Sequence, residues 1–167
     1  IRRFKYSSVT GGAAENERQT IDITKGSSEW TAISRVYLDA AGEVIRRNCK
    51  SVDPSLVYTD TTNRNDVVSL KMVNDGENLY IRVETKSPVT EYEEGDEEWM
   101  NVYIATGASG GWENYNYIVN RRPNADGTTS VQKLNGTVLE EAGAARYFCQ
   151  GNYIFYEIPL SALGVTA

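Results

Sequence analysis

The chain has 167 residues, of which 40% are hydrophobic and 24% are charged, and its formal net charge is -6. This length suits a single domain with one core. The acidic balance argues against a protein that binds nucleic acid or an anionic membrane, because both need a basic surface. The sequence has no histidine. That excludes Ser-His-Asp and Cys-His catalytic systems, histidine-containing zinc sites and imidazole pH switches.

The N-terminal part of the chain is polar and carries no periodic pattern, and Gly11-Gly12 is typical of a linker. We therefore predict a linker, or the end of a preceding domain, over residues 1–27 and a β-sandwich over residues 28–167. The sequence begins at Ile1 and contains neither a signal peptide nor a membrane span. We interpret it as a piece of a longer or processed protein whose targeting signal lies upstream.

Two cysteines, Cys49 and Cys149, are too few for a zinc site made of cysteine alone. They form either one disulfide or two unreactive thiols. A disulfide between them would close a long loop and fit an exported protein.

From Trp30 onward, short runs rich in β-branched and aromatic residues alternate with clusters of Gly, Asn and Asp. This spacing predicts an all-β fold, specifically a two-sheet antiparallel β-sandwich of the jelly-roll or immunoglobulin-like type. The strongest helix candidate, Leu139 to Arg146, is short and contains Gly143.

Alternation within the expected strands separates two faces. In residues 79–84 and 153–158 the aliphatic side chains fall on one side, which predicts the face that meets the core. The opposite side interleaves rings with polar groups, whereas a plain solvent face carries mainly Thr, Lys, Glu and Ser. The aromatic and polar set comprises Tyr80, Arg82, Trp99, Asn101, Tyr103, Tyr153 and Phe155.

Sugars present flat patches of C–H bonds and a rim of hydroxyl groups, so a protein that binds them needs aromatic planes beside fixed polar groups. Residues 112–122 supply both, directly after Gly110-Gly111. The competing interpretation is that the rings only pack between two sheets. The predicted ligand-binding residues are Trp112, Tyr115, Tyr117, Asn120 and Arg121, with Trp99, Tyr80 and Arg82 as second candidates.

The acidic run over residues 91–98 is open to three interpretations: a catalytic carboxylate pair, a calcium site, or a solvated surface loop. We favour the loop, because the ordered spacing of a calcium loop is missing.

In the segment from Thr62 to Asp66, the Asn and Asp residues favour turns and Arg64 could pair with a carboxylate, so a structural role is favoured there as well. Asn135-Gly136-Thr137 matches the N-glycosylation pattern.

Five motifs occur in order along the chain: Tyr37 to Glu43, Thr62 to Asp66, Asp75 to Thr85, Trp99-Met100 and Trp112 to Arg121. Together they resemble the family 9 carbohydrate-binding modules, which are related to DOMON-like sandwiches. The similarity covers roughly residues 28 to 163. More narrowly, the motifs resemble the version of this module that follows sugar-acting catalytic domains in secreted bacterial proteins.

This resemblance implies a β-sandwich that binds carbohydrate without hydrolysing it and resides outside the cell, in the periplasm or at the cell surface. It also implies a parent catalytic domain in the same chain, such as a glycoside hydrolase, and allows structural calcium but requires no cofactor. The alternatives are a sandwich that packs on its parent domain without binding a ligand, a glycosidase or lyase, and a haem-binding domain. Haem is disfavoured because histidine is absent and Met72 and Met100 are the only methionines.

Overall fold

The computed structural model describes residues 18–42, 47–50, 57–60, 62–96 and 98–165. The elements are η1 (Ile23–Trp30), β1 (Tyr37–Leu38), β2 (Arg47–Lys50), β3 (Val57–Asp60), β4 (Val67–Asn74), β5 (Asn78–Thr85), β6 (Val102–Ile104), β7 (Tyr117–Val119), β8 (Thr128–Asn135), β9 (Val138–Gln150), β10 (Tyr153–Pro159) and η2 (Leu160–Leu163).

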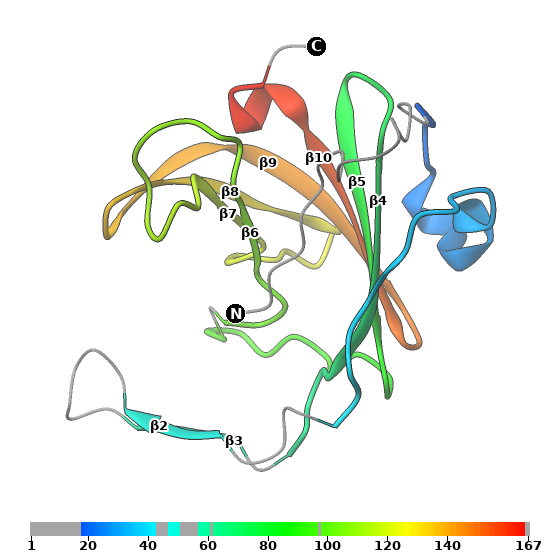
Figure 1. Ribbon diagram of the computed structural model, residues 1–167, viewed down its shortest axis with the longest axis horizontal. Helices are drawn as coiled ribbons and strands as arrows, with labels where there is room; N and C mark the ends of the chain where they lie inside the picture. The colour runs from blue at the N-terminus through cyan, green and yellow to red at the C-terminus, as the bar shows by residue number, and fades with distance from the viewer. Residues whose placement is uncertain (1–17, 43–46, 51–56, 61, 97, 166–167) are drawn as a thin grey trace.

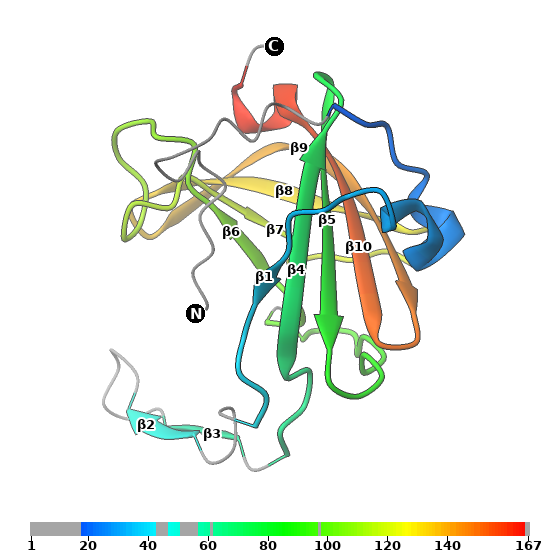
Figure 2. The same cartoon turned by 45° about the vertical axis from the view of Figure 1, so that its right-hand side comes forward.

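Eight strands form one antiparallel sheet in the order β1-β4-β5-β10-β9-β8-β7-β6, and this sheet curls strongly (Figures 1 and 2). The hairpin of β2 and β3 lies apart from it in both views. The all-β prediction is therefore confirmed.

The inner face of the curled sheet encloses the main core. In β5 and β10 the predicted alternation is confirmed, since Ile81, Val83, Ile154 and Ile158 are all buried in this inner core. Side chains from the other strands of the sheet and from η2 complete the core. No helix in the described part of the chain has the length and hydropathy that a membrane crossing demands.

A second apolar cluster covers the outer face of β4, β5 and β10, where η1 packs. Trp30 is fully buried and stacks on Phe155, with ring centroids 6.3 Å apart. Tyr80 belongs to the same cluster and is 2% exposed. The Lys71 ammonium group holds the end of η1 on the sheet by donating hydrogen bonds to the carbonyl oxygens of Trp30 and Ile33 at 3.0 and 2.6 Å. The outer face of β4, β5 and β10, which carries Tyr80 and Phe155, is thus buried under η1 and forms a second core.

Part of the predicted linker is folded onto the sheet. Ile21 and Ile23 are 2% and 1% exposed and lie in the outer cluster. The backbone N–H of Gln19 donates to the carbonyl of Asn74 at 3.1 Å. The folded unit therefore extends back at least to Arg18, while the part of the predicted linker before Arg18 lies outside the described residues.

The helix candidate over residues 139–146 is wrong, because this segment lies within strand β9. It follows a two-residue loop, Gly136-Thr137, that joins β8 to β9 in an antiparallel hairpin. Gly136 has φ +60°, which matches the glycine-first hairpin turn. Gly143 sits at a shift of register opposite Val131, where the strand bulges. Pairing with β8 across the hairpin therefore makes residues 139–146 a strand and not a helix.

Asp75 organises the connection between β4 and β5. Its carboxylate accepts hydrogen bonds from the backbone N–H groups of Glu77 and Asn78 at 2.9 and 2.8 Å and from the Tyr80 hydroxyl at 2.7 Å. Burial acts to raise the pKa of Asp75, but these hydrogen bonds outweigh it and lower the pKa to about 2.

This shift makes the stability of the protein sensitive to acid. Because the folded-state pKa lies below the ordinary value of 3.8, the stabilisation by Asp75 is complete above about pH 4 and is lost as the pH falls towards 2. We expect Asp75→Asn to reduce the free energy of unfolding by roughly 1 kcal/mol at pH 6. The difference from the natural protein should shrink between pH 4 and pH 2 in urea unfolding. A difference that stays constant over this range would contradict the assignment.

Candidate functional site

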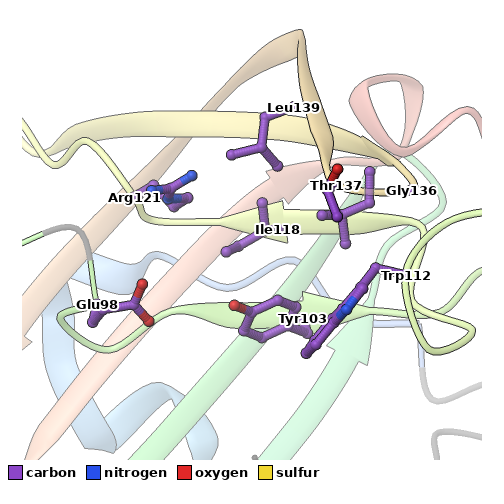
Figure 3. A pocket seen from close by; sticks show the side chains of 9 residues that line it. Glu98, Tyr103, Trp112, Ile118, Arg121, Gly136, Thr137 and Leu139 are labelled. Atoms are coloured by element: carbon purple, nitrogen blue, oxygen red, sulfur yellow. The ribbon is translucent and has the colours of Figure 1, made fainter. Parts of the chain in front are cut away.

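A shallow groove lies on the outer face of β6, β7 and β8 and the start of β9, on the half of the sheet away from η1. Its volume is about 210 Å³. Figure 3 shows Tyr103 and Trp112 along one wall, Thr137 and Leu139 along the other, and Arg121 and Glu98 towards one end. The lining residues are Glu98, Tyr103, Trp112, Ile118, Arg121, Leu134, Gly136, Thr137 and Leu139.

A tight turn presents Trp112 to this groove. The backbone N–H groups of Trp112 and Tyr115 donate to each other's carbonyl oxygens at 3.0 and 2.8 Å. The two residues between them, Glu113 and Asn114, have φ +48° and +71°. Two consecutive positive φ angles define a type I′ turn, which asparagine tolerates better than most residues.

The turn places two aromatic rings, those of Trp112 and Tyr115, against the ring of Tyr103. The Tyr103 ring lies 5.8 Å from the Trp112 ring and 5.6 Å from the Tyr115 ring, centroid to centroid, in tilted arrangements. Pairs with this geometry are favourable by about 0.5–1.5 kcal/mol beyond the burial of area. The Trp112 ring is therefore held in place before any ligand arrives.

Asn116 fixes the loop that leads into the turn. It is 3% exposed, and its side-chain oxygen accepts from the backbone N–H of Thr106 at 2.9 Å. Its amide group donates to the carbonyl oxygens of Ala108 and Gly110 at 3.1 and 3.4 Å. Asn116 is thus a positioning residue that closes the loop under Trp112.

Of the glycines at positions 107, 110 and 111, only Gly111 has no room for a side chain. Its φ is +88°, and a Cβ atom placed there would lie 2.0 Å from the carbonyl oxygen of Tyr115. We expect Gly111→Ala to open the turn, lowering the free energy of unfolding by about 1–3 kcal/mol and disordering the Trp112 ring. Gly110→Ala is the matched control, because no atom lies within 4 Å of a Cβ there although its φ is also positive. Urea unfolding should show a clearly larger loss for Gly111→Ala, and equal losses would contradict this account.

The polar end of the groove depends on a break in strand alternation. Asn120 has φ +75°, and directly after it Arg121 lines the outer groove beside Ile118. Strict alternation instead places Arg121 on the side of Tyr117 and Val119, which belong to the inner core. Asn120 itself is fully buried, and its amide group donates to the carbonyl of Trp99 at 3.1 Å.

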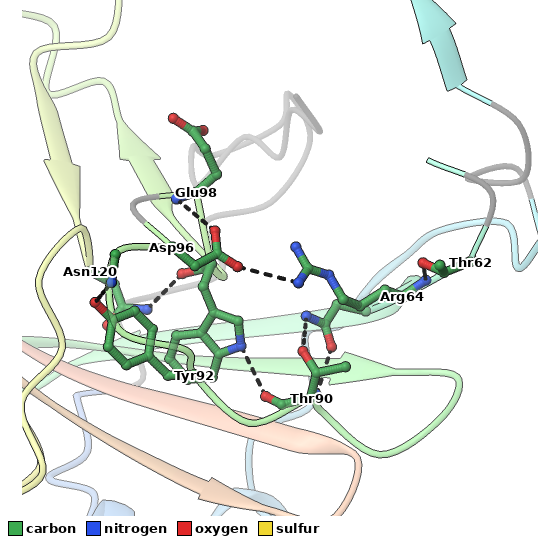
Figure 4. A network of polar contacts seen from close by, with 10 residues as sticks. Thr62, Arg64, Thr90, Tyr92, Asp96, Glu98 and Asn120 are labelled. Carbon is green, nitrogen blue, oxygen red and sulfur yellow. Dashed lines mark hydrogen bonds and ion pairs between the residues drawn. The ribbon is translucent and has the colours of Figure 1, made fainter. Parts of the chain in front are cut away.

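Glu98 reaches the same end from a loop held by a polar network (Figure 4). The Asp96 carboxylate accepts from the Arg64 guanidinium at 3.3 Å and from the backbone N–H of Glu98 at 3.2 Å. The Trp99 indole donates to the carbonyl of Thr90 at 2.9 Å. The predicted pairing of Arg64 with a carboxylate is confirmed. The described part of the acidic run forms a surface loop that the hydrogen bonds of Asp96 hold in place.

The structure brings only some of the predicted ligand-binding residues together. Trp112 and Arg121 line the groove, and Tyr115 supports the Trp112 wall through its contact with Tyr103. Tyr117 and Asn120 lie on or beside β7 but are buried, with Tyr117 in the inner core.

The second candidates lie away from the groove. Trp99 is 2% exposed in the inner core, where its ring packs against those of Tyr92 and Tyr147. Tyr80 is buried under η1, and burial, followed by the hydrogen bond to Asp75, raises its pKa. Arg82 is 8% exposed and donates to the Ser69 hydroxyl and the Glu84 carboxylate at 3.2 and 3.4 Å. All three side chains are buried, and none of them lines the groove beside Trp112.

Several groove residues were not among the predicted binding residues. Tyr103 carried a usable signal, since alternation already placed it opposite the aliphatic face. The walls and floor also come from an aliphatic set that looks like ordinary core in the sequence. Its members are Ile118, Leu134 and Leu139.

Neither calcium nor a disulfide gains support from the described residues. No group of three or more Asp, Glu or Cys side chains in those ranges is placed to hold a metal ion. Cys149 is an exposed free thiol on β9. The side chain of Cys49, on β2, lies outside the described residues. Asn135 of the glycosylation pattern is exposed next to the hairpin turn that borders the groove.

Comparison with known proteins adds no assignment: no family model, curated protein or solved structure matches the chain.

Proposed function

We propose that the protein binds a carbohydrate, without hydrolysing it, in the groove lined by Tyr103, Trp112 and Arg121. The supporting observation is the placement of a braced, partly exposed indole on the wall of a depression whose end carries a guanidinium and a carboxylate. The indole offers a plane for the C–H patch of a sugar ring, and Arg121 and Glu98 offer hydrogen bonds to its hydroxyl rim.

The proposal assigns binding rather than catalysis because of the number of carboxylates in the groove. Glycoside hydrolysis ordinarily uses two carboxyl groups about 5–9.5 Å apart on either side of the bond. Among the described residues that line the groove, Glu98 alone carries a carboxylate.

The wider setting of the proposal comes from the resemblance to family 9 carbohydrate-binding modules. On that basis we propose an exported accessory module beside a catalytic domain in the same chain, with structural calcium as an option. We also propose that the two halves of the curled sheet, which face each other across the inner core, correspond to the two layers of the family's sandwich. The alternative is a module that only packs on its parent domain, with the groove covered by protein.

Calorimetric titration of the protein with a panel of glycans tests the proposal. Variants of two neighbouring arginines show whether binding takes place in the groove. Arg121 lines the groove, whereas Arg122 forms an exposed ion pair with Glu141 at 3.2 Å. We expect Arg121→Ala to weaken binding about 10- to 100-fold, the worth of a hydrogen bond to a charged group, and Arg122→Ala to leave it within about twofold. Equal effects, or no binding to any glycan, would favour the packing role.

A further inference from the structure

The floor of the groove is aliphatic. Ile118 and Leu134 are 3% and 7% exposed and line it from below. Tyr103 is paired with Ile118 across β6 and β7, and Leu134 is paired with Leu139 across β8 and β9. The register therefore sets a ring on one side of the floor and a leucine on the other (Figure 3).

The two charged side chains of the groove lie away from this floor. Arg121 and Glu98 lie towards one end, and Thr137 lies on the wall that carries Leu139, opposite Trp112, in the view of Figure 3. A sugar stacked on Trp112 turns one edge of its ring towards Ile118 and Leu134. A hydroxyl group placed directly on these two side chains would give up its water without gaining a partner from either of them, which costs about tenfold or more in affinity.

The charges at the polar end indicate a neutral ligand. One cation, Arg121, and one anion, Glu98, border the same end of the groove. The chain as a whole carries a formal net charge of -6. A uronate or a sulfated sugar would meet a carboxylate beside the guanidinium and an acidic protein around it.

We infer that the groove selects a neutral sugar that carries a methyl-terminated substituent, such as an acetamido group, an O-acetyl group or a deoxy methyl group. The methyl group lies on the floor of Ile118 and Leu134 against Leu139, while the ring stacks on Trp112. The hydroxyl rim then faces Arg121 and Glu98. This inference rests on the proposed carbohydrate binding and narrows its ligand class.

Matched ligand pairs test the inference by calorimetry on the full chain. One pair is the β-1,4-linked trimers of N-acetylglucosamine and glucose. A second is L-fucose and L-galactose, and a third is acetylated and deacetylated xylan oligosaccharides. We expect the methyl-bearing member of at least one pair to bind at least about tenfold more tightly, and the pair that discriminates identifies the source of the methyl group. The inference is overturned if the hydroxylated members bind as tightly in all three pairs, although carbohydrate binding itself would stand. If no sugar binds, both proposals fail.

Two neighbouring residues of β9 separate the floor contact from a general effect on the hairpin. Leu139 lines the groove, whereas Val138 is 58% exposed and does not. Leu139→Thr should bring the preference for the methyl-bearing sugar close to onefold while the hydroxylated partner still binds. Val138→Thr should keep the preference intact. Leu139→Ala is a milder substitution for the case in which Leu139→Thr does not fold. A preference that survives both Leu139 variants would overturn the assignment of the floor.

Discussion

Replacing Trp112 by alanine is expected to weaken the proposed carbohydrate binding by at least about thirtyfold, the effect of truncating an aromatic side chain at the centre of a binding site. The stability of the fold should change little, because Trp112 is partly exposed and its backbone hydrogen bonds with Tyr115 do not depend on the indole. Calorimetric titration gives the affinity, and the Tm of the variant checks its fold.

Trp112→Phe is the matched control for this loss. It keeps an aromatic plane on the same type I′ turn, so binding should fall by less than about tenfold. An alanine variant that binds within about threefold of the natural protein would place the sugar elsewhere. Equal losses in the alanine and phenylalanine variants would mean that the indole N–H, and not the ring plane, makes the contact.

Replacing Trp30 by alanine is expected to lower the free energy of unfolding by about 3–5 kcal/mol, as for other large buried aromatic side chains. Trp30 is fully buried between η1 and the outer face of β10, where it stacks on Phe155. Urea unfolding followed by circular dichroism measures the change. The glycan affinity of the folded fraction should be unaltered, because Trp30 belongs to a different cluster from the groove.

Leu38→Ala provides the comparison for the Trp30 variant. Leu38 is 77% exposed on the edge strand β1, so its loss should be within about 0.5 kcal/mol. A loss below about 1 kcal/mol for Trp30→Ala would contradict the finding that η1 and the sheet share a second core.

Alternation in the sequence predicted the inner face of the sheet well, because β5 and β10 are regular strands with one face in the main core. It failed to predict that the opposite face of the same strands is also buried. The covering element, η1, is a short 3-10 helix interrupted at Gly26, where φ is +66°. Such a segment has no sustained helical period, so residues 18–27 looked like part of a linker.

Two residues with positive φ explain the misplaced site residues. Met100 and Asn120 have φ +49° and +75°. Both lie just outside a strand, where the two-residue alternation ceases to hold. Trp99 consequently lies in the inner core, and Arg121 lines the outer groove. Positive φ is uncommon in methionine, and no local sequence signal predicts it there.

The groove itself depends on pairings that are distant in the sequence. Ile118 is opposite Tyr103, and Leu134 is opposite Leu139, through the registers of two separate hairpins. Composition around Trp112 predicted the aromatic wall, since the signal is local. The aliphatic wall could not be predicted without the register of β8 and β9.

The indole resonances of the protein provide the most direct test of the proposed carbohydrate site. The chain has three tryptophans. Trp30 and Trp99 are 0% and 2% exposed in the two cores, whereas Trp112 lines the groove. In a nitrogen–proton correlation spectrum recorded during titration with a bound glycan, the Trp112 indole signal should move progressively while the other two stay in place. A glycan that binds and leaves the Trp112 signal unmoved would contradict the account.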